Sequence, residues 1–365
     1  MSLIESGSIK THSAPSSITK PHSTSYLTAL QPLQTSLAVS SQQNVLLLDR
    51  ATFKPRSVIP HEARVSKLIG CSHDPNAVAS ADYNGNVWIW DQRMNGENAT
   101  SVLVKSTRGK KAPIQALGID TSSNAIAAGT ELVNDDASVI IWDIRNTKDH
   151  LRRYDELHSD DITTLKFLPN KHLLTAATDG LLMYVDPSIE DDNDASLGCV
   201  NVGSSVADAG LLSDGSIYAF TDMQSAAFYT LDAENELELQ KDLGDIRQRS
   251  LDKRWESDYI INMSEIDNNV VMFSGKSSGE FSMMTDLKSD SMQLERVMKG
   301  GHSELVRAVC YDEQLNAIVS VAEDAKIAVW NIQDASNGFR LERPRDDDDE
   351  DVEMEDTSSS KKSRQ

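Results

Sequence analysis

The sequence predicts an all-β fold, a seven-bladed β-propeller followed by a disordered acidic tail. Three observations predict it: a short apolar run that recurs seven times, a polar turn residue at a fixed distance before each run, and histidines placed at the same repeat spacing. Repetition at a period of about 40 residues indicates equal structural units that bury their apolar faces against their neighbours.

The recurring runs are clearest at NVWIWD (86–91), SVIIWD (138–143) and KIAVWN (326–331), which read as buried strands after polar turns. Weaker copies are LLLD (46–49), LMYVD (182–186), FYTLD (228–232) and FSMMT (281–285). Their reference positions are Leu48, Trp90, Trp142, Val185, Leu231, Met284 and Trp330, spaced by 42, 52, 43, 46, 53 and 46 residues. We therefore expect one four-stranded blade per repeat, with loop insertions in the longer ones.

A polar residue stands six positions before each reference position, where a tight hairpin is expected. These residues are Gln42, Asn84, Asp136, Asp179, Ser225, Ser278 and Asp324. Four residues earlier, on the preceding strand, hydroxyls recur at Ser80, Thr175, Thr221, Ser274 and Ser320, while Ala38 is an exception and a longer turn moves the match to Thr130. The pattern indicates hairpins of one architecture.

Three histidines follow the same repeat. His61, His158 and His302 precede the reference positions of their repeats by 29, 27 and 28 residues. Each stands just ahead of an apolar strand start. This spacing is typical of a repeat and not of one isolated active site.

These features resemble the WD-repeat β-propeller family over roughly residues 25 to 335. In that family a histidine, a strand hydroxyl, a turn aspartate and a tryptophan form a hydrogen-bonded structural tetrad. The resemblance implies a complete tetrad of His302, Ser320, Asp324 and Trp330; a second of His61, Ser80, Asn84 and Trp90; and a third of His158, Thr175 and Asp179 with Val185 in place of tryptophan.

The stretches AGTELVNDDASVIIWDIR (128–145), HSDDITTLKF (158–167) and GGHSELVRAV (300–309) further resemble the family of WD repeat-containing protein 89. That resemblance implies a seven-bladed propeller with a nuclear, nucleolar or nucleocytoplasmic location. It implies no particular biochemical activity.

A hydrolase built on His302, Ser320 and Asp324 is the alternative interpretation of the most complete repeat. Such an enzyme needs an exposed serine beside an oxyanion hole. Ser320 lies inside the apolar strand AIVSVA, and equivalent hydroxyls recur in four other repeats. Because no Walker loop, GxSxG elbow or HExxH helix occurs, the sequence predicts a protein that is not an enzyme and uses no cofactor.

Composition restricts the partners. The chain has 365 residues, with 57 Asp and Glu against 35 Lys and Arg, a net charge of −22 that repels phosphate backbones. We therefore expect basic proteins as partners and no direct binding of nucleic acid. Cys71, Cys199 and Cys310 lack zinc-site spacing, and no run approaches the ~18 apolar residues of a spanning helix. The sequence thus predicts no metal site and no membrane insertion.

Three regions are expected: an irregular N-terminal segment (1–24), the propeller (25–343) and a disordered tail (344–365). In the tail, nine of the eleven residues from Asp346 to Asp356 are acidic, and the basic run KKSR (361–364) follows them. The tail either attracts basic proteins or only solubilises the chain. The outer strand of the last blade could come from the residues before Tyr26 or from GFRLE (338–342).

On one propeller face, WD-repeat relatives bind partners through residues just before the turn aspartate and just after the histidine. The corresponding residues are Tyr83, Asp135, Thr178 and Glu323, together with Glu62, Asp160 and Glu304. Glu304 and Glu323 are the first to test. A second candidate is the segment 244–259, because Arg247, Arg249 and Trp255 are residue types enriched in interface hot spots. The alternative is that Trp255 packs beneath its own loop.

Two motifs, WDQR (90–93) and WDIR (142–145), resemble that of propellers that serve as substrate receptors of cullin-based ubiquitin ligases. Arg93 and Arg145 would then contact the ligase adaptor; alternatively they pair with carboxylates at the blade edge. The leading hypothesis is a monomeric, nuclear, non-enzymatic scaffold that binds or escorts a basic protein. The ubiquitin-ligase receptor is the second hypothesis.

Overall fold

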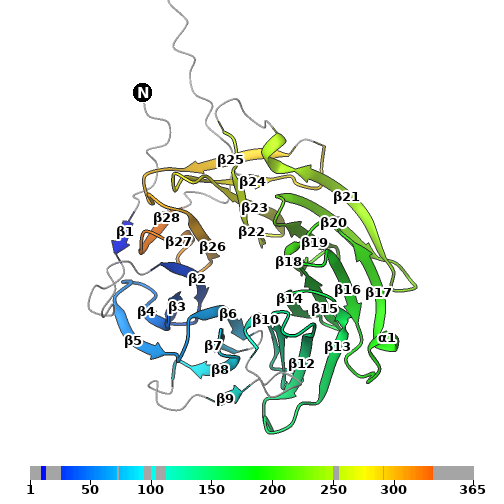
Figure 1. Ribbon diagram of the computed structural model, residues 1–365. Coiled ribbons are helices and arrows are strands. Elements are labelled where there is room, and N and C mark those ends of the chain that lie inside the picture. Colours follow the sequence, from blue (N-terminus) through cyan, green and yellow to red (C-terminus); the bar gives the residue numbers. More distant parts are fainter. Residues whose placement is uncertain are drawn as a thin grey trace, which may run out of the picture.

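In the computed structural model, seven four-stranded antiparallel sheets are arranged radially around a central axis (Figure 1). The structure describes residues 10–13, 26–71, 74–93, 100–103, 112–249, 255–290 and 292–331. The predicted seven-bladed propeller is confirmed. The acidic tail and the basic run KKSR lie outside the described residues.

Each blade is named by its strands from the centre outward. Blade 1 consists of β2 (Leu27–Pro32), β3 (Ser36–Ser41), β4 (Asn44–Asp49) and β5 (Pro55–Pro60), and blade 2 consists of β6 (Val65–Cys71), β7 (Asp74–Asp82), β8 (Asn86–Asp91) and β9 (Thr100–Leu103). Blade 3 consists of β10 (Ile114–Asp120), β11 (Ala125–Thr130), β12 (Ala137–Asp143) and β13 (Arg152–His158). Blade 4 consists of β14 (Ile162–Phe167), β15 (Leu173–Ala177), β16 (Leu181–Val185) and β17 (Ser196–Asn201).

Blade 5 consists of β18 (Val206–Leu211), β19 (Ile217–Thr221), β20 (Ser225–Leu231) and β21 (Leu237–Asp245). Blade 6 consists of β22 (Tyr259–Ile266), β23 (Asn269–Gly275), β24 (Phe281–Thr285) and β25 (Gln293–Met298). Blade 7 consists of β26 (Val306–Asp312), β27 (Ala317–Ala322), β28 (Lys326–Asn331) and β1 (Lys10–Ser13). The helix α1 (Asp192–Ala195) and the 3₁₀ turn η1 (Ile246–Gln248) lie in connections. All seven reference positions fall in the third strand of a blade, so the predicted repeats are confirmed.

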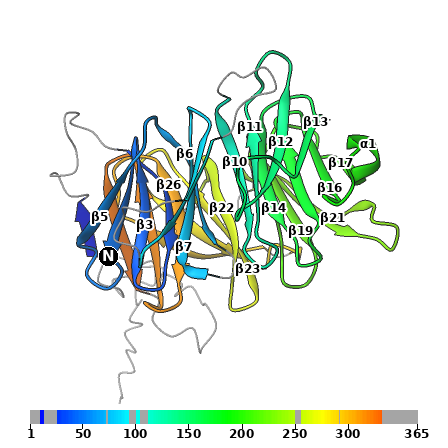
Figure 2. The same cartoon turned by 90° about the horizontal axis from the view of Figure 1, so that it is seen from below.

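The apolar core is divided among the blade interfaces. Seven clusters of buried side chains are found among the described residues, and each joins two neighbouring blades. The second strands are buried on both faces, as in SLAVSS of β3 and AIVSVA of β27. They therefore carry continuous apolar runs, because each sheet packs between two others. Figure 2 shows the ring from the side, with the connections at the two opposite ends of the strands.

The ring is closed by the N-terminal segment. β1 pairs antiparallel with β28, from Lys10 opposite Val329 to Ser13 opposite Lys326. A buried ion pair also joins the first and last blades: the Arg50 guanidinium donates to both carboxylate oxygens of Asp312 at 2.6 Å. Strand pairing and an ion pair thus hold blade 7 against blade 1.

Candidate protein-interaction face

One end of the ring carries the two kinds of predicted contact residue, those just before the turn aspartate and those just after the histidine. A repeated backbone bond joins the turn between the second and third strands to the entry of the inner strand of the same blade. It runs from Tyr83 N to Arg64 O (3.0 Å), from Thr178 N to Asp161 O (2.9 Å) and from Glu323 N to Leu305 O (3.0 Å). We call this end, formed by those turns and entries, the turn face.

Blade 7 contains the complete tetrad. His302 Nε2 lies 2.8 Å from Ser320 Oγ, and Nδ1 lies 3.2 Å from Asp324 Oδ1. The Trp330 indole N–H donates to Ser320 Oγ at 2.9 Å. A carboxylate only accepts, so Nδ1 carries the proton and Nε2 accepts from the serine hydroxyl. The preceding Gly301 is required, because a Cβ there would lie 2.4 Å from the Trp330 ring.

The tetrad is buried, and burial sets its charges. Desolvation lowers the pKa of His302, against the attraction of Asp324, so the imidazole favours its neutral form. Desolvation opposes ionisation of Asp324, but the Ser303 backbone N–H and His302 outweigh it and lower the pKa of the carboxyl. The network therefore joins a neutral ring to a carboxylate that anchors the turn.

Blade 4 repeats this arrangement without a tryptophan. His158 Nε2 lies 2.8 Å from Thr175 Oγ1, and Nδ1 lies 3.1 Å from Asp179 Oδ2. The backbone N–H groups of Ser159 and Leu181 also donate to Asp179. The carboxylate thus ties the histidine loop to the hairpin turn.

Blade 2 differs from the expectation for Asn84. His61 Nε2 and the Trp90 indole N–H both reach Ser80 Oγ, at 2.8 and 3.0 Å. His61 Nδ1, however, lies 3.3 Å from Ile59 O, and the turn is organised by Asp82, which accepts from the backbone N–H of Asn84 at 2.9 Å. Asn84 thus occupies the turn position that Asp324 has in blade 7, but His61 contacts Ile59 O, and Asp82, two residues earlier, supplies the carboxylate of this turn.

The geometry of Ser320 contradicts a nucleophilic role. Its side chain is 0% exposed, in the middle of β27, and its hydroxyl is engaged by both His302 and Trp330. A substrate carbonyl has no access to it. The His302, Ser320 and Asp324 group is therefore architectural.

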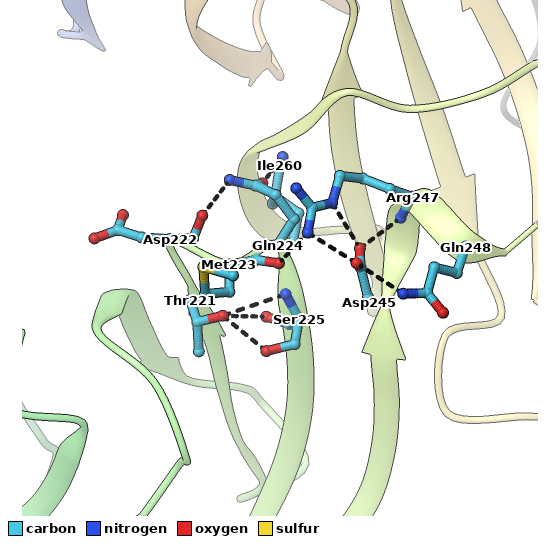
Figure 3. A network of polar contacts seen from close by, with 9 residues as sticks. All are labelled: Thr221, Asp222, Met223, Gln224, Ser225, Asp245, Arg247, Gln248 and Ile260. Carbon is cyan, nitrogen blue, oxygen red and sulfur yellow. Dashed lines mark hydrogen bonds and ion pairs between the residues drawn. The ribbon is translucent and has the colours of Figure 1, made fainter.

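Blade 5 has no histidine and holds its turn differently (Figure 3). Gln224, at a φ of 63°, accepts the backbone N–H of Ile260 from blade 6 at 2.6 Å and donates to Asp222 O at 2.9 Å. Arg247 donates to Met223 O at 3.1 Å and pairs with Asp245 at 2.8 Å. The Met223 side chain, held in this fixed turn, is 59% exposed.

Trp255 is not the exposed contact residue that one hypothesis expected. It is only 2% exposed and packs in the cluster between blades 5 and 6. Its indole N–H donates to Ser257 Oγ at 3.0 Å, and Ser257 Oγ lies 2.7 Å from Ser274 Oγ. Trp255 therefore belongs to the core, and a partner cannot reach it without unfolding the loop.

The two arginines of the same segment are partly engaged. Arg247 is paired with Asp245, and its side chain is 43% exposed. Arg249 donates through Nε to Leu243 O at 2.5 Å. Both guanidinium groups stabilise their own connection, and only part of each faces solvent.

The predicted acidic residues of the turn face divide into free and paired ones. Glu62, Asp135 and Glu304 are exposed, and none has a hydrogen-bond or ion-pair partner among the described residues. Glu323 instead forms an ion pair with Arg307, and Asp160 accepts from the Asp161 backbone N–H at 2.8 Å. Of the two residues chosen for the first test, only Glu304 offers a free carboxylate.

Tyr83 and Thr178 sit on the turn face as expected, and both are half-buried. The Arg64 guanidinium lies 5.7 Å from the centre of the Tyr83 ring. The Thr178 carbonyl accepts from Ser205 Oγ at 3.0 Å, which links blade 4 to blade 5. Tyr83 and Thr178 therefore contribute mainly to the packing of the turns and project little into solvent.

Apolar side chains on the turn face were missed by the sequence reasoning. Leu132 is 39% exposed beside Asp161, whose carboxylate accepts the Leu132 N–H at 2.7 Å, and Tyr26 is 44% exposed at the entry of β2. Single apolar residues in polar turns give no periodic signal. With Met223, they add apolar contact area to an acidic surface.

Arg93 and Arg145 lie at the opposite end of the blades. Arg93 pairs with Asp91 and with Asp74, at 2.5 and 2.9 Å, and Arg145 pairs with Asp143 at 2.5 Å. Their side chains are still 58% and 69% exposed. Both arginines therefore pair at the blade edge and keep a surface that another protein could contact.

Within the described part of the chain, no group of three His, Cys, Asp or Glu side chains has the arrangement of a metal site. The helices found there are also too short and polar to cross a membrane.

No protein-family model matches the chain. It is similar to an uncharacterized WD repeat-containing protein of Schizosaccharomyces pombe (27% identity, covering 73% of this chain and 83% of that protein), to the WD repeat-containing protein 89 homolog of Dictyostelium discoideum (22%, covering 74% and 75%) and to an uncharacterized WD repeat-containing protein of Saccharomyces cerevisiae (27%, covering 80% and 74%).

Among solved structures, a chain of the mitotic checkpoint complex has the same fold. The TM-score is 0.67 at 12% identity, covering 91% of this chain and 94% of that one. The chain is therefore a seven-bladed β-propeller with buried His, Ser and Trp networks, and it is similar to WD repeat-containing proteins of three organisms.

Proposed function

We propose that this protein is a non-enzymatic scaffold that binds a basic segment of a protein partner across its turn face, acting as a monomeric propeller in the nucleus or in both nucleus and cytoplasm. Its WD-repeat homologues suggest a protein-interaction scaffold. The nuclear location draws on the resemblance to the family of WD repeat-containing protein 89 and on the KKSR run.

One observation supports the proposal of a basic partner. Three exposed carboxylates of the turn face have no hydrogen-bond or ion-pair partner among the described residues: Glu62, Asp135 and Glu304. Each stands beside a hairpin or strand entry that backbone hydrogen bonds hold in place. The backbone at these positions is therefore fixed before binding, and lysine or arginine side chains are the natural ligands of a carboxylate.

The net charge of −22 supports the same partner class, because long-range attraction speeds the encounter with a basic protein. We propose that the acidic tail (344–365) adds to this attraction. A tail contribution through charge alone should be strongest at low ionic strength.

The test uses the full chain and a synthetic lysine- and arginine-rich peptide as the probe. Replacing Glu62, Asp135 and Glu304 by Gln, Asn and Gln should weaken binding roughly tenfold or more, at about 0.5–1 kcal/mol for each exposed charge pair. The matched control replaces Glu190, Glu234 and Glu238 by Gln, three exposed carboxylates away from the turn face. An equal loss in both triple variants would show that only net charge matters, and the turn face would be abandoned.

Removal of residues 344–365 tests the tail separately. We expect weaker peptide binding at low salt and a smaller difference at high salt. Equal affinity of the two proteins at low salt would leave the tail as a solubilising segment only.

A second candidate function is that of a substrate receptor for a cullin-based ubiquitin ligase. The exposure of Arg93 and Arg145 supports it, whereas their pairing with Asp91 and Asp143 weakens it. Replacing both arginines by Ala should abolish co-purification of the ligase adaptor. Absence of the adaptor from a pull-down with the unaltered protein would end this hypothesis.

A further inference from the structure

Blade 7 obtains its outer strand differently from the other six. In blades 1 to 6 the outer strand follows the third strand directly, after a connection of five residues (50–54 and 232–236) to ten residues (186–195). In blade 7 the third strand, β28, pairs with β1 from the other end of the chain. The outer edge of β28 is thus occupied by a strand that is not joined to it by a hairpin.

The composition of β1 also sets it apart. β1 reads KTHS and, alone among the seven outer strands that the structure describes, contains no Val, Ile, Leu, Met, Phe, Tyr or Trp. Other outer strands bury such residues, for example Ile59 of β5 and Tyr154 of β13. Backbone hydrogen bonds must therefore provide most of the attachment of β1, because it offers little apolar surface to bury.

The chain beyond β28 has the features of an ordinary outer strand. Residues 332–337 would form a six-residue connection, within the range of blades 1 to 6, and Asn337-Gly338 is a favoured hairpin dipeptide. In GFRLE (338–342), Phe339 and Leu341 alternate with polar residues, and Pro344 ends any strand. In both blades 2 and 3 the paired residues nearest this connection are 11 apart (Ile89 with Thr100, Ile141 with Arg152). The same register would pair Val329 with Arg340.

We propose that the outer edge of β28 is an exchangeable strand site, occupied by β1 in the structure and by residues 338–342 in a second state. The connecting segments are 14–26 for β1 and 332–337 for the C-terminal strand, a roughly twofold difference in length that costs little extra closure entropy. β1 and residues 338–342 therefore compete on comparable terms. Exchange would fix the start of the acidic tail beside blade 7 and release the N-terminal segment.

This inference does not depend on the proposed function, and it is tested in the full chain by hydrogen exchange and thermal unfolding. In one variant Thr11 and His12 both become Pro, so that whichever N–H faces β28 is lost. In a second, Arg340 and Leu341 become Pro, and in a third all four changes are combined. The control carries prolines at Thr357 and Ser358, outside both strands.

We expect the first variant to slow exchange of the 339–342 amides about tenfold or more, because the freed edge now binds them. The second should unfold at the temperature of the unaltered protein, and the fourfold variant should lose more than the sum of the two. Unchanged exchange at 339–342 in the first variant, its failure to fold, or simple additivity would each overturn the proposal. The control should match the unaltered protein in both measurements.

Discussion

At the scale of single residues, the tetrads show how one set of side chains joins two loops to a strand. Ser320 receives the Trp330 indole N–H and donates to His302, which in turn contacts Asp324. All four groups are satisfied, which is what allows polar side chains to be buried inside a blade. The same residue types in an exposed cleft would indicate a catalytic site, whereas their burial inside the blade gives them a structural role.

The tetrad histidines predict a stability change in mild acid. Burial lowers the pKa of His61 and of His302 below the ordinary value, so the unfolded chain binds these protons more readily than the folded one. Their stabilising contribution is present above about pH 6.5 and is lost as the pH falls towards their folded pKa values. Thermal unfolding between pH 7.5 and 5 measures this loss.

The variant His302→Gln should be less stable at pH 7.5 and should show a shallower decline towards pH 5. His150→Gln, which removes an exposed histidine, is the control and should keep the original profile. The lowered pKa values of Asp179 and Asp324 act in a separate range, because their contribution is lost only below about pH 4. If the stability of His302→Gln fell between pH 7.5 and 5 in parallel with that of the unaltered protein, this would contradict the assignment of that pH range to the buried histidines.

At the scale of elements, blades without a histidine and tryptophan pair are held by other residues. Blade 5 uses Gln224 and Arg247 to fix its turn, and blade 6 uses the Trp255, Ser257 and Ser274 chain. Lys276 Nζ also lies 4.7 Å from the centre of the Trp255 ring. The connection before blade 6 therefore supplies a buried indole, whereas the reference position of its third strand holds Met284 in place of a tryptophan.

Trp255→Ala should destabilise the protein by about 3–5 kcal/mol, because it leaves a cavity between two blades and removes the hydrogen bond to Ser257. Chemical denaturation followed by circular dichroism measures the change. Met223→Ala, at an exposed position of the neighbouring turn, should change stability by less than about 0.5 kcal/mol. Similar losses in the two variants would contradict the buried role of Trp255.

At the scale of the whole molecule, ring closure concentrates long-range contacts at the junction of blades 1 and 7. Besides β1, the Arg50 and Asp312 pair spans this junction, with side chains that are 12% and 0% exposed. Arg50 also donates to Leu33 O at 2.6 Å. The pair is thus satisfied and shielded from solvent, unlike the ion pairs at the blade edges.

Arg50→Ala should cost about 3–5 kcal/mol of unfolding free energy, since Asp312 would remain buried without its counter-ion. Arg93→Ala, which breaks exposed pairs, should cost less than about 1 kcal/mol. The double variant Arg50→Ala with Asp312→Asn should lose less than the sum of the single changes. Additive losses would show that the two side chains do not act as a pair.

The sequence by itself determined the number of blades and the histidine, hydroxyl and tryptophan positions of the tetrads. These follow from local pattern, because each repeat must place an apolar strand, a turn and a histidine at set distances to stack on its neighbours. The sequence also predicted which residues lie on the turn face, since turn positions are set by the same repeat.

Only the tertiary structure decided which of those residues are available and how the ring closes. Glu323 and Glu304 look equivalent in the chain, but Arg307 pairs with one and leaves the other free. Trp255 lies in a polar, basic stretch and is nonetheless buried between two blades, and the turn that contains Asn84 is organised by the Asp82 carboxylate. Pairing, burial and the choice of β1 as the outer strand depend on contacts between distant parts of the chain, which local pattern does not encode.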